Sequence, residues 1–238
     1  MTVATSHTGV GRPGRRWEIA FYRVTRRAIW VAAKLLGRIT VVGAENIPTH
    51  GSFVLAPVHR SNIDFALVAL VTKRRMRYMG KDSIFRWQIP SKLVIALGAF
   101  PVHRGSADRE ALRVCIEVID SGQPLVMFPE GTRQSGPVVE ELFDGTVYVA
   151  GKTQVPIVPV GIGGSERVMP KGARMLHPAK LVLVVGEPIA PPPPTDGGRV
   201  GRKAIRNTTE ELLTDIQGVF DLAQAMTGHP NAAPDKTS

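Results

Sequence analysis

The stretch GSFVLAPVHRSNIDFALVAL, residues 51–70, holds an extended segment, a turn and the start of a helix in close succession. Ser52–Pro57 is an apolar run of strand length, and Val58–Asn62 has the composition of a turn. A second apolar run, DFALVALV, begins near Ile63 and is typical of a buried helix. Because a strand that leads through a short loop into a helix is the repeating unit of an α/β domain, this stretch decides the fold class.

The same alternation continues along the chain. We expect further strands at residues 39–42, 76–80, 99–102, 125–128 and 157–160, and further helices at residues 85–97, 107–121 and 139–152. Gly122 follows the second of these helices and fits a stop signal. The sequence therefore predicts an α/β fold with a mixed, mostly parallel sheet flanked by helices.

The chain divides into one main domain and several flanking segments. Residues 1–14 are rich in Gly, Thr and Pro and are expected to be disordered, and residues 15–38 are expected to form an amphipathic helix. The α/β domain is expected at residues 39–190. A Pro-rich linker (191–198), a C-terminal helix (199–226) and a disordered tail (227–238) are expected to follow it. The α/β domain is long enough to bury a sizeable core.

The helix expected at 15–38 has two distinct stripes. Its apolar residues recur at three- and four-residue steps, and they are Trp17, Phe21, Val24, Ala28, Val31 and Leu35. Its basic residues lie beside them, and they are Arg16, Arg23, Arg27 and Lys34. This pattern fits a helix that lies in a bilayer interface with its cations on lipid phosphates. It fits equally an ordinary helix that packs on the domain and exposes a basic side.

The charge balance indicates an anionic partner. Thirty Lys and Arg residues against twenty Asp and Glu residues give a formal charge of +10. Because the sequence has no zinc-finger or RNP pattern and only 6% aromatic residues, it argues against nucleic acid and favours an anionic membrane or a phosphorylated substrate. No apolar run of about 18 residues and no secretory signal is evident, so we expect a peripheral or monotopic protein on the cytoplasmic face of the cell membrane. The single cysteine, Cys115, fits an inert core position.

His59 and Asp64 are the first candidates for catalysis. Five residues on one regular helix would turn them about 140° apart, so they can meet only if His59 lies in the loop and Asp64 in the first helical turn. In that arrangement the carboxylate orients the imidazole, which becomes a plausible general base for a hydroxyl. Alone, the spacing fits chance occurrence with a surface or helix-cap role better than a catalytic pair.

Two further motifs offer groups for anion binding. GAFPVHRG, residues 98–105, places Arg104 after an expected strand, and FPEGTR, residues 128–133, delivers Glu130, Gly131, Thr132 and Arg133 to a loop after a buried strand. A guanidinium suits a phosphate, and Glu130 could accept a hydrogen bond from a substrate hydroxyl. Each arginine taken singly fits a salt bridge or a solvated loop side chain better than a phosphate site. The motif VPIVPVGIGG, residues 155–164, is more consistent with shaping the sheet.

Taken in order, these four motifs resemble the signature of the glycerolipid acyltransferases, specifically the PlsC-type 1-acylglycerol-3-phosphate acyltransferases. The resemblance covers about residues 51–164. It implies the glycerolipid acyltransferase fold, with His59 and Asp64 as the catalytic pair. It also implies that the acceptor and its phosphate are bound by Arg104, Glu130, Gly131, Thr132 and Arg133, with Lys81 as a further candidate.

The resemblance carries expectations about substrates. It implies an acyl-CoA or acyl carrier protein thioester as donor, lysophosphatidic acid as acceptor, and no cofactor or metal. Glycerol 3-phosphate or another phosphorylated lipid is an alternative acceptor, and a non-catalytic lipid-binding or nucleic-acid-binding protein is the alternative in kind. The sequence departs from the family at Val58, where Asn is common, and at His103, where an acidic residue is common.

Overall fold

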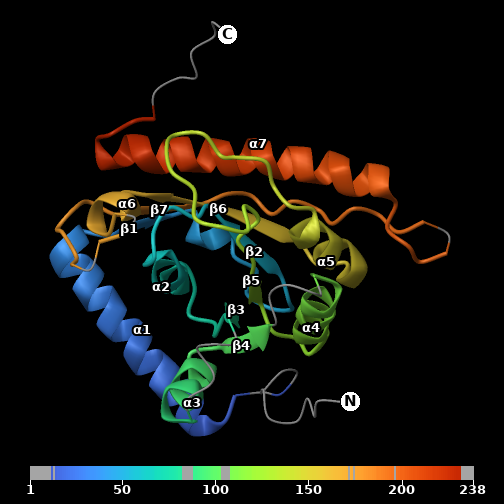
Figure 1. Ribbon diagram of the computed structural model, residues 1–238, viewed down its shortest axis with the longest axis horizontal. Coiled ribbons are helices and arrows are strands. Elements are labelled where there is room, and N and C mark those ends of the chain that lie inside the picture. Colours follow the sequence, from blue (N-terminus) through green and yellow to red (C-terminus); the bar gives the residue numbers. More distant parts are fainter. Residues whose placement is uncertain are drawn as a thin grey trace, which may run out of the picture.

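A mixed sheet forms the centre of the computed structural model (Figure 1). The structure describes residues 12, 14–81, 88–102, 108–170, 172–173, 175–195 and 197–231. Within them seven strands form one sheet in the order β1-β7-β6-β2-β5-β3-β4. The strands are β1 (Thr40–Val42), β2 (Val54–Pro57), β3 (Arg77–Lys81), β4 (Ala99–Val102), β5 (Leu125–Val126), β6 (Ile157–Gly163) and β7 (Val182–Val185). Every neighbouring pair is parallel except β6 with β7, which confirms the predicted mixed, mostly parallel sheet.

Helices surround this sheet. They are α1 (Arg16–Gly37), α2 (Asp64–Leu67), α3 (Gln88–Ala96), α4 (Asp108–Asp120), α5 (Gly145–Thr153), α6 (Ser165–Val168) and α7 (Arg202–Thr227), with the 3-10 turns η2 (Ala44–Asn46) and η3 (Val68–Leu70). Most of them lie where the sequence places a helix. The helix expected at 139–152 begins only at Gly145, because upstream backbone donors are used elsewhere: Val139 N–H donates to Gln217 and Phe143 N–H to Pro129.

Strand β7 and helix α6 are missing from the sequence-based prediction. The strand follows a loop rather than a helix and runs antiparallel to β6, so it breaks the strand–helix alternation on which the prediction rests. Its apolar run from Leu181 to Val185 is the signal that could have revealed it, since all five residues are buried.

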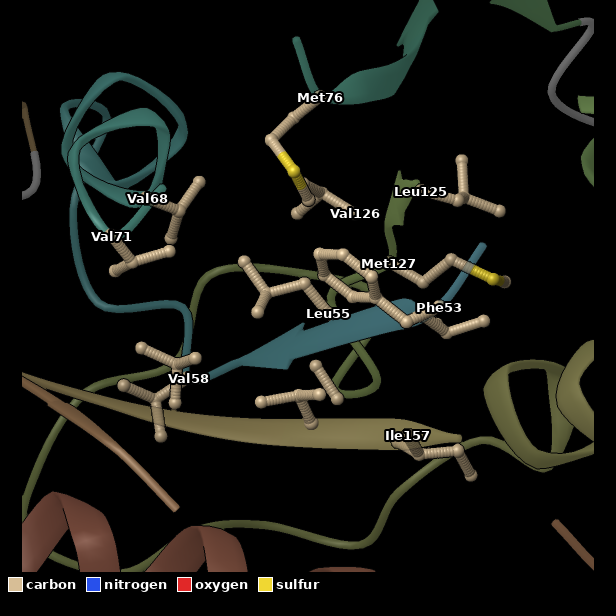
Figure 2. Packing of buried hydrophobic residues seen from close by; sticks show 14 of the residues in the cluster. Phe53, Leu55, Val58, Val68, Val71, Met76, Leu125, Val126, Met127 and Ile157 are labelled. Carbon is tan, nitrogen blue, oxygen red and sulfur yellow. The ribbon is translucent and has the colours of Figure 1, made fainter. Parts of the chain in front are cut away.

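The core lies along the central strands. Phe53 and Leu55 of the β2 segment are fully buried in one cluster with Met76, Leu125 and Ile157, and Figure 2 shows these side chains gathered around the strand. Strands buried on both faces are expected in a parallel sheet that helices cover.

Cys115 also belongs to this core, as the sequence predicted. It is fully buried on α4, and burial raises the pKa of its thiol to about 12. The thiolate, which is the reactive form, is therefore scarce at neutral pH.

Helix α1 turns its apolar stripe outward. Val24 is 68% exposed and Leu35 is 79% exposed, and the side buried against the domain carries Tyr22 and Ala33 instead. The apolar stripe that the sequence identifies is therefore mostly exposed, while α1 packs on the domain with a different side. In the described part of the chain, no helix combines the length and the apolar character needed to cross a membrane.

The Pro-rich segment and helix α7 pack on the domain. Gln154 Nε2 at the end of α5 donates to the Pro192 carbonyl at 3.1 Å, and α7 runs along β6 and β7 (Figure 1). Several predictions fall wholly or partly outside the described residues: the disordered segments at 1–14 and 227–238, residues His103 and Arg104, and the side chain of Lys81.

Candidate active site

The candidate site lies where parallel strands end at one edge of the sheet. Strand β2 ends at Pro57, two residues before His59, and the neighbouring strand β5 leads to Phe128 and Glu130. Because parallel strands end together, motifs about 70 residues apart in sequence meet in one place, as His59 N–H and the Glu130 carboxylate do at 2.9 Å. Loops at this edge of an open α/β sheet commonly bind ligands.

His59 and Asp64 are in contact. His59 Nδ1 lies 3.0 Å from Asp64 Oδ2, with the histidine in the loop and the aspartate at the first residue of α2. The same oxygen accepts the backbone N–H groups of Arg60 at 2.7 Å and Ser61 at 2.6 Å, so it also closes the turn. Because a carboxylate only accepts hydrogen bonds, we assign the ring proton to Nδ1, which leaves Nε2 as a free base.

The environment of this pair suits a general base. The Asp64 side chain is completely buried, whereas 19% of the His59 side chain is exposed and can meet a ligand. The His59 ring also lies against Phe128, with ring centroids 4.2 Å apart and planes tilted by 30°. Asp64, beside the N-terminal end of α2, can stabilise an imidazolium without contacting the substrate itself.

An apolar cavity opens beside His59. Its volume is about 630 Å³, within the range of about 300–1,000 Å³ that is usual for ligand pockets. It extends from the site toward the inner side of α1 and is enclosed by helices α2 and α3 and strands β3 and β4. Representative lining residues are Ile29, Phe65, Ala69, Met79, Leu97 and Val126.

Glu130 does not face a ligand. Its side chain is fully buried, and its two oxygens accept from Arg60 Nη1 at 2.7 and 2.8 Å. One of them also accepts the His59 N–H, so both oxygens bond to groups of the protein. The prediction that Glu130 accepts a hydrogen bond from a substrate hydroxyl therefore does not fit the structure, because the side chain points into the protein.

The rest of the FPEGTR loop is more open. Gly131 lines the cavity with a left-handed φ of 67°, and a Cβ there would come within 2.7 Å of the Phe143 ring, so glycine is required. Thr132 is exposed and Arg133 is partly exposed. Within the described part of the chain Arg133 makes no hydrogen bond or ion pair, which leaves its guanidinium available to an anion.

Some site residues are missing from the sequence-based prediction. Arg60, which pairs with Glu130, and Phe128, which lies against His59, belong to motifs that the sequence singles out, but nothing in their spacing reveals their direction. Asn62, in the turn before α2, and Phe65, on α2, also line the cavity without a signal in the sequence. In the described residues, no group of three or more His, Cys, Asp or Glu side chains could hold a metal ion.

The sequence is similar to that of known acyltransferases. The family model described as Acyltransferase matches residues 38–163. A 1-acyl-sn-glycerol-3-phosphate acyltransferase of Bacillus subtilis is 27% identical over 169 residues, which cover 71% of this chain and 82% of that protein. A chloroplastic enzyme of the same description from Arabidopsis thaliana is 27% identical over 157 residues, and the match covers 64% of this chain and 44% of that longer protein.

The fold comparison agrees. The crystal structure of the 1-acyl-sn-glycerophosphate acyltransferase PlsC from Thermotoga maritima superimposes with a TM-score of 0.71 and 27% sequence identity. The match covers 87% of this chain and 83% of that one, so the likeness extends well beyond the motif-bearing segment.

Proposed function

Because this chain belongs to the acyltransferase family, and within it to the 1-acyl-sn-glycerol-3-phosphate type, we propose that it moves a fatty acyl group from a thioester to the free hydroxyl of lysophosphatidic acid. The observation that carries this proposal is the contact of His59 with Asp64, at 3.0 Å, beside a large apolar cavity. A positioned base next to an acyl-sized pocket is what transfer to a hydroxyl requires.

The proposed chemistry uses His59 Nε2 as the general base. Nε2 takes the acceptor hydroxyl proton while that oxygen attacks the thioester carbonyl, and Asp64 stabilises the imidazolium through Nδ1–H. The tetrahedral intermediate then collapses, the carbon–sulfur bond breaks, and the imidazolium proton passes to the leaving thiolate. The products are an ester and a free thiol, and His59 returns to its neutral form.

We propose that the apolar cavity takes the acyl chain. Its walls are mostly apolar, and His59 lies on its lining, so a chain inside it would present its carbonyl carbon to the base. Burial of methylene groups contributes about 0.8 kcal/mol each, which gives a long-chain thioester a large share of its binding energy.

Arg133 is the described residue best suited to the acceptor phosphate. It has no partner among the described residues and follows Gly131, which lines the cavity. A guanidinium offers a planar pair of donors to phosphate oxygens. Arg104 and Lys81 are proposed as further phosphate ligands on the family resemblance alone, since their side chains lie outside the described residues.

We also propose that α1 rests on an anionic membrane. Its exposed apolar residues include Trp17, Val24 and Leu35, and the exposed basic residues Arg23 and Lys34 lie on the same helix. An apolar stripe flanked by cations is the composition of an interfacial helix. The cavity reaches the inner side of this helix, so a lipid acceptor would have a short path from the bilayer.

The decisive experiment is a panel of acceptors with long-chain acyl-CoA and acyl carrier protein thioesters, read by mass spectrometry. Lysophosphatidic acid should give phosphatidic acid, and glycerol 3-phosphate and lysophosphatidylcholine should give little product. His59→Ala should lower turnover by about 10²–10⁴-fold. His50→Ala is the matched control, because His50 is exposed and, among the described residues, its side chain hydrogen-bonds only to Thr49. Equal turnover in both variants would remove His59 from the mechanism.

A further inference from the structure

Arg60, the neighbour of His59, carries a charge that the proposed chemistry does not use. Its side chain is buried, with a relative exposure of 3% for the residue, and it points away from the cavity. Burying a guanidinium carries a desolvation penalty that only well-placed partners offset. Its contacts therefore indicate what the residue is for.

The first contacts fix the backbone of His59. Arg60 Nη1 donates to both oxygens of Glu130, at 2.7 and 2.8 Å, and to the His59 carbonyl at 3.2 Å. Glu130 in turn accepts the His59 N–H at 2.9 Å. One buried ion pair thus holds both backbone polar groups of His59, and Gln134 N–H adds a second donor to the same carbonyl at 2.9 Å.

The second set of contacts links this ion pair to the catalytic carboxylate. The backbone N–H of Arg60 donates to Asp64 Oδ2 at 2.7 Å, the oxygen that also meets His59 Nδ1. Arg60 therefore contacts the His59–Asp64 pair through its backbone N–H, and it forms the ion pair with Glu130 through its side chain. Movement of Arg60 would change the position of His59 and of Asp64 together.

Helix α7 supplies the third set of contacts. The Arg60 guanidinium lies over the Phe220 ring, 4.9 Å from its centroid, and Nη2 donates to the Val138 carbonyl at 3.0 Å. Gln217, one turn before Phe220, accepts from Val139 N–H at 2.7 Å and donates to the Pro137 carbonyl at 3.0 Å. The helix thus holds the loop that Arg60 contacts.

We propose that Arg60 is a positioning residue for acyl transfer and that α7 supports it through Phe220 and Gln217. The C-terminal helix lies beyond residues 38–163, which the family model matches, yet it belongs to the apparatus that orients the base. The inference rests on the proposed function, because turnover is its first measure. A displacement of about 1 Å at a reacting group can cost about 100-fold in rate, and Arg60 prevents such a displacement.

The main test is Arg60→Met, which keeps an unbranched apolar stem and removes the guanidinium with its charge. We expect kcat per folded molecule to fall about 100-fold, with KM for both substrates changed less than about threefold. Arg74→Met is the matched control, since Arg74 also lies over a buried aromatic ring, Phe53 at 5.3 Å, and donates to carbonyls away from the site. Its kcat should stay within about threefold of the wild type.

A double variant separates positioning from simple loss of folding. Arg60→Met leaves the Glu130 carboxylate buried and unpaired, so adding Glu130→Gln should restore kcat at least tenfold. If Arg60→Met does not fold, Phe220→Leu carries the same test and should lower kcat about tenfold, because it removes the ring beneath the guanidinium. If the kcat of Arg60→Met, or of Phe220→Leu where Arg60→Met does not fold, equals that of Arg74→Met, the inference is overturned.

Amide hydrogen exchange tests the same inference without turnover. In Arg60→Met the peptides that cover His59 should exchange at least tenfold faster than in the wild type, whereas in Arg74→Met they should not. Equal exchange in the two variants overturns the inference, whatever the turnover data give. If the wild type acylates none of the acceptors, the proposed function fails, and the exchange result still decides the role of Arg60.

Discussion

Helices α1 and α7 are both long and amphipathic, but they turn opposite faces to the protein. In α7 the apolar stripe is buried, with Leu212, Ile216 and Phe220 at 0% exposure. In α1 the apolar stripe faces outward, and the buried side carries Tyr22, whose hydroxyl is within 3.3 Å of the Arg74 carbonyl. The same sequence pattern is therefore buried in one helix and exposed in the other.

The packing beneath the two helices also differs, being close under α7 and open under α1. Helix α7 lies directly on β6, because Gly161 and Gly163 have no Cβ that would collide with its backbone. Helix α1 instead leaves the apolar cavity open between its inner side and the sheet. Close packing around α7 suits an element that holds the loop of His59, and loose packing under α1 suits the acyl-chain binding that we propose for the cavity.

Stability should distinguish the two helices most strongly. Leu212→Ala removes a fully buried side chain and should lower the free energy of unfolding by about 2–5 kcal/mol. Leu35→Ala, at a residue 79% exposed, should change it by about 0.5 kcal/mol or less. Urea unfolding followed by circular dichroism measures both values. Similar losses would mean that α1 also packs its apolar stripe on the protein.

Substitutions on the exposed face should affect membrane binding more in α1 than in α7, the reverse of their order for stability. Val24→Glu with Leu35→Glu places two charges on the exposed stripe of α1, and flotation with anionic vesicles should fall at least tenfold, because each buried apolar side chain contributes about 1.5–3 kcal/mol. Leu222→Glu on α7 is the control, at 48% exposure. Undiminished flotation of the α1 variant would place the membrane contact elsewhere.

The sequence predicts the existence of both helices, but not which way they face. Periodicity depends only on the helix itself, so residues 15–38 and 199–226 are identified within one to three residues of α1 and α7. Orientation depends on what lies opposite. The glycines that accept α7 belong to β6, about 60 residues away in sequence, and no local pattern connects them.

The site follows the same division. The contact of His59 with Asp64 is predictable because it is local and the loop-to-helix geometry leaves few options. The burial of Glu130 is not predictable, because it depends on Arg60, 70 residues away, facing inward from the adjacent loop. The two loops meet because β2 pairs with β5, and no single motif contains that pairing.

The cavity under α1 offers a third test of the comparison. Ala69→Phe places a ring into that space, so the enzyme should prefer shorter acyl chains, with the ratio of short-chain to long-chain product raised about tenfold. Competition between decanoyl and palmitoyl thioesters, read by mass spectrometry, measures this ratio. Ala225→Phe on α7 is the control, since Ala225 is exposed and does not line the cavity. An unchanged ratio would place the acyl chain outside this cavity.

Single surface charges should give the smallest difference between the helices. Arg23 is exposed beside the apolar stripe of α1, and a cation near an anionic membrane contributes about 1 kcal/mol, so Arg23→Gln should weaken vesicle binding about fivefold. Arg206→Gln removes an equally exposed cation from α7 and should have no such effect. Added salt shortens the Debye length and so screens exposed charges. The difference between the two variants should therefore shrink from about 0.05 M to about 0.5 M salt. Equal weakening by both variants would mean that net charge alone attracts the protein, with α1 having no privileged orientation toward the bilayer.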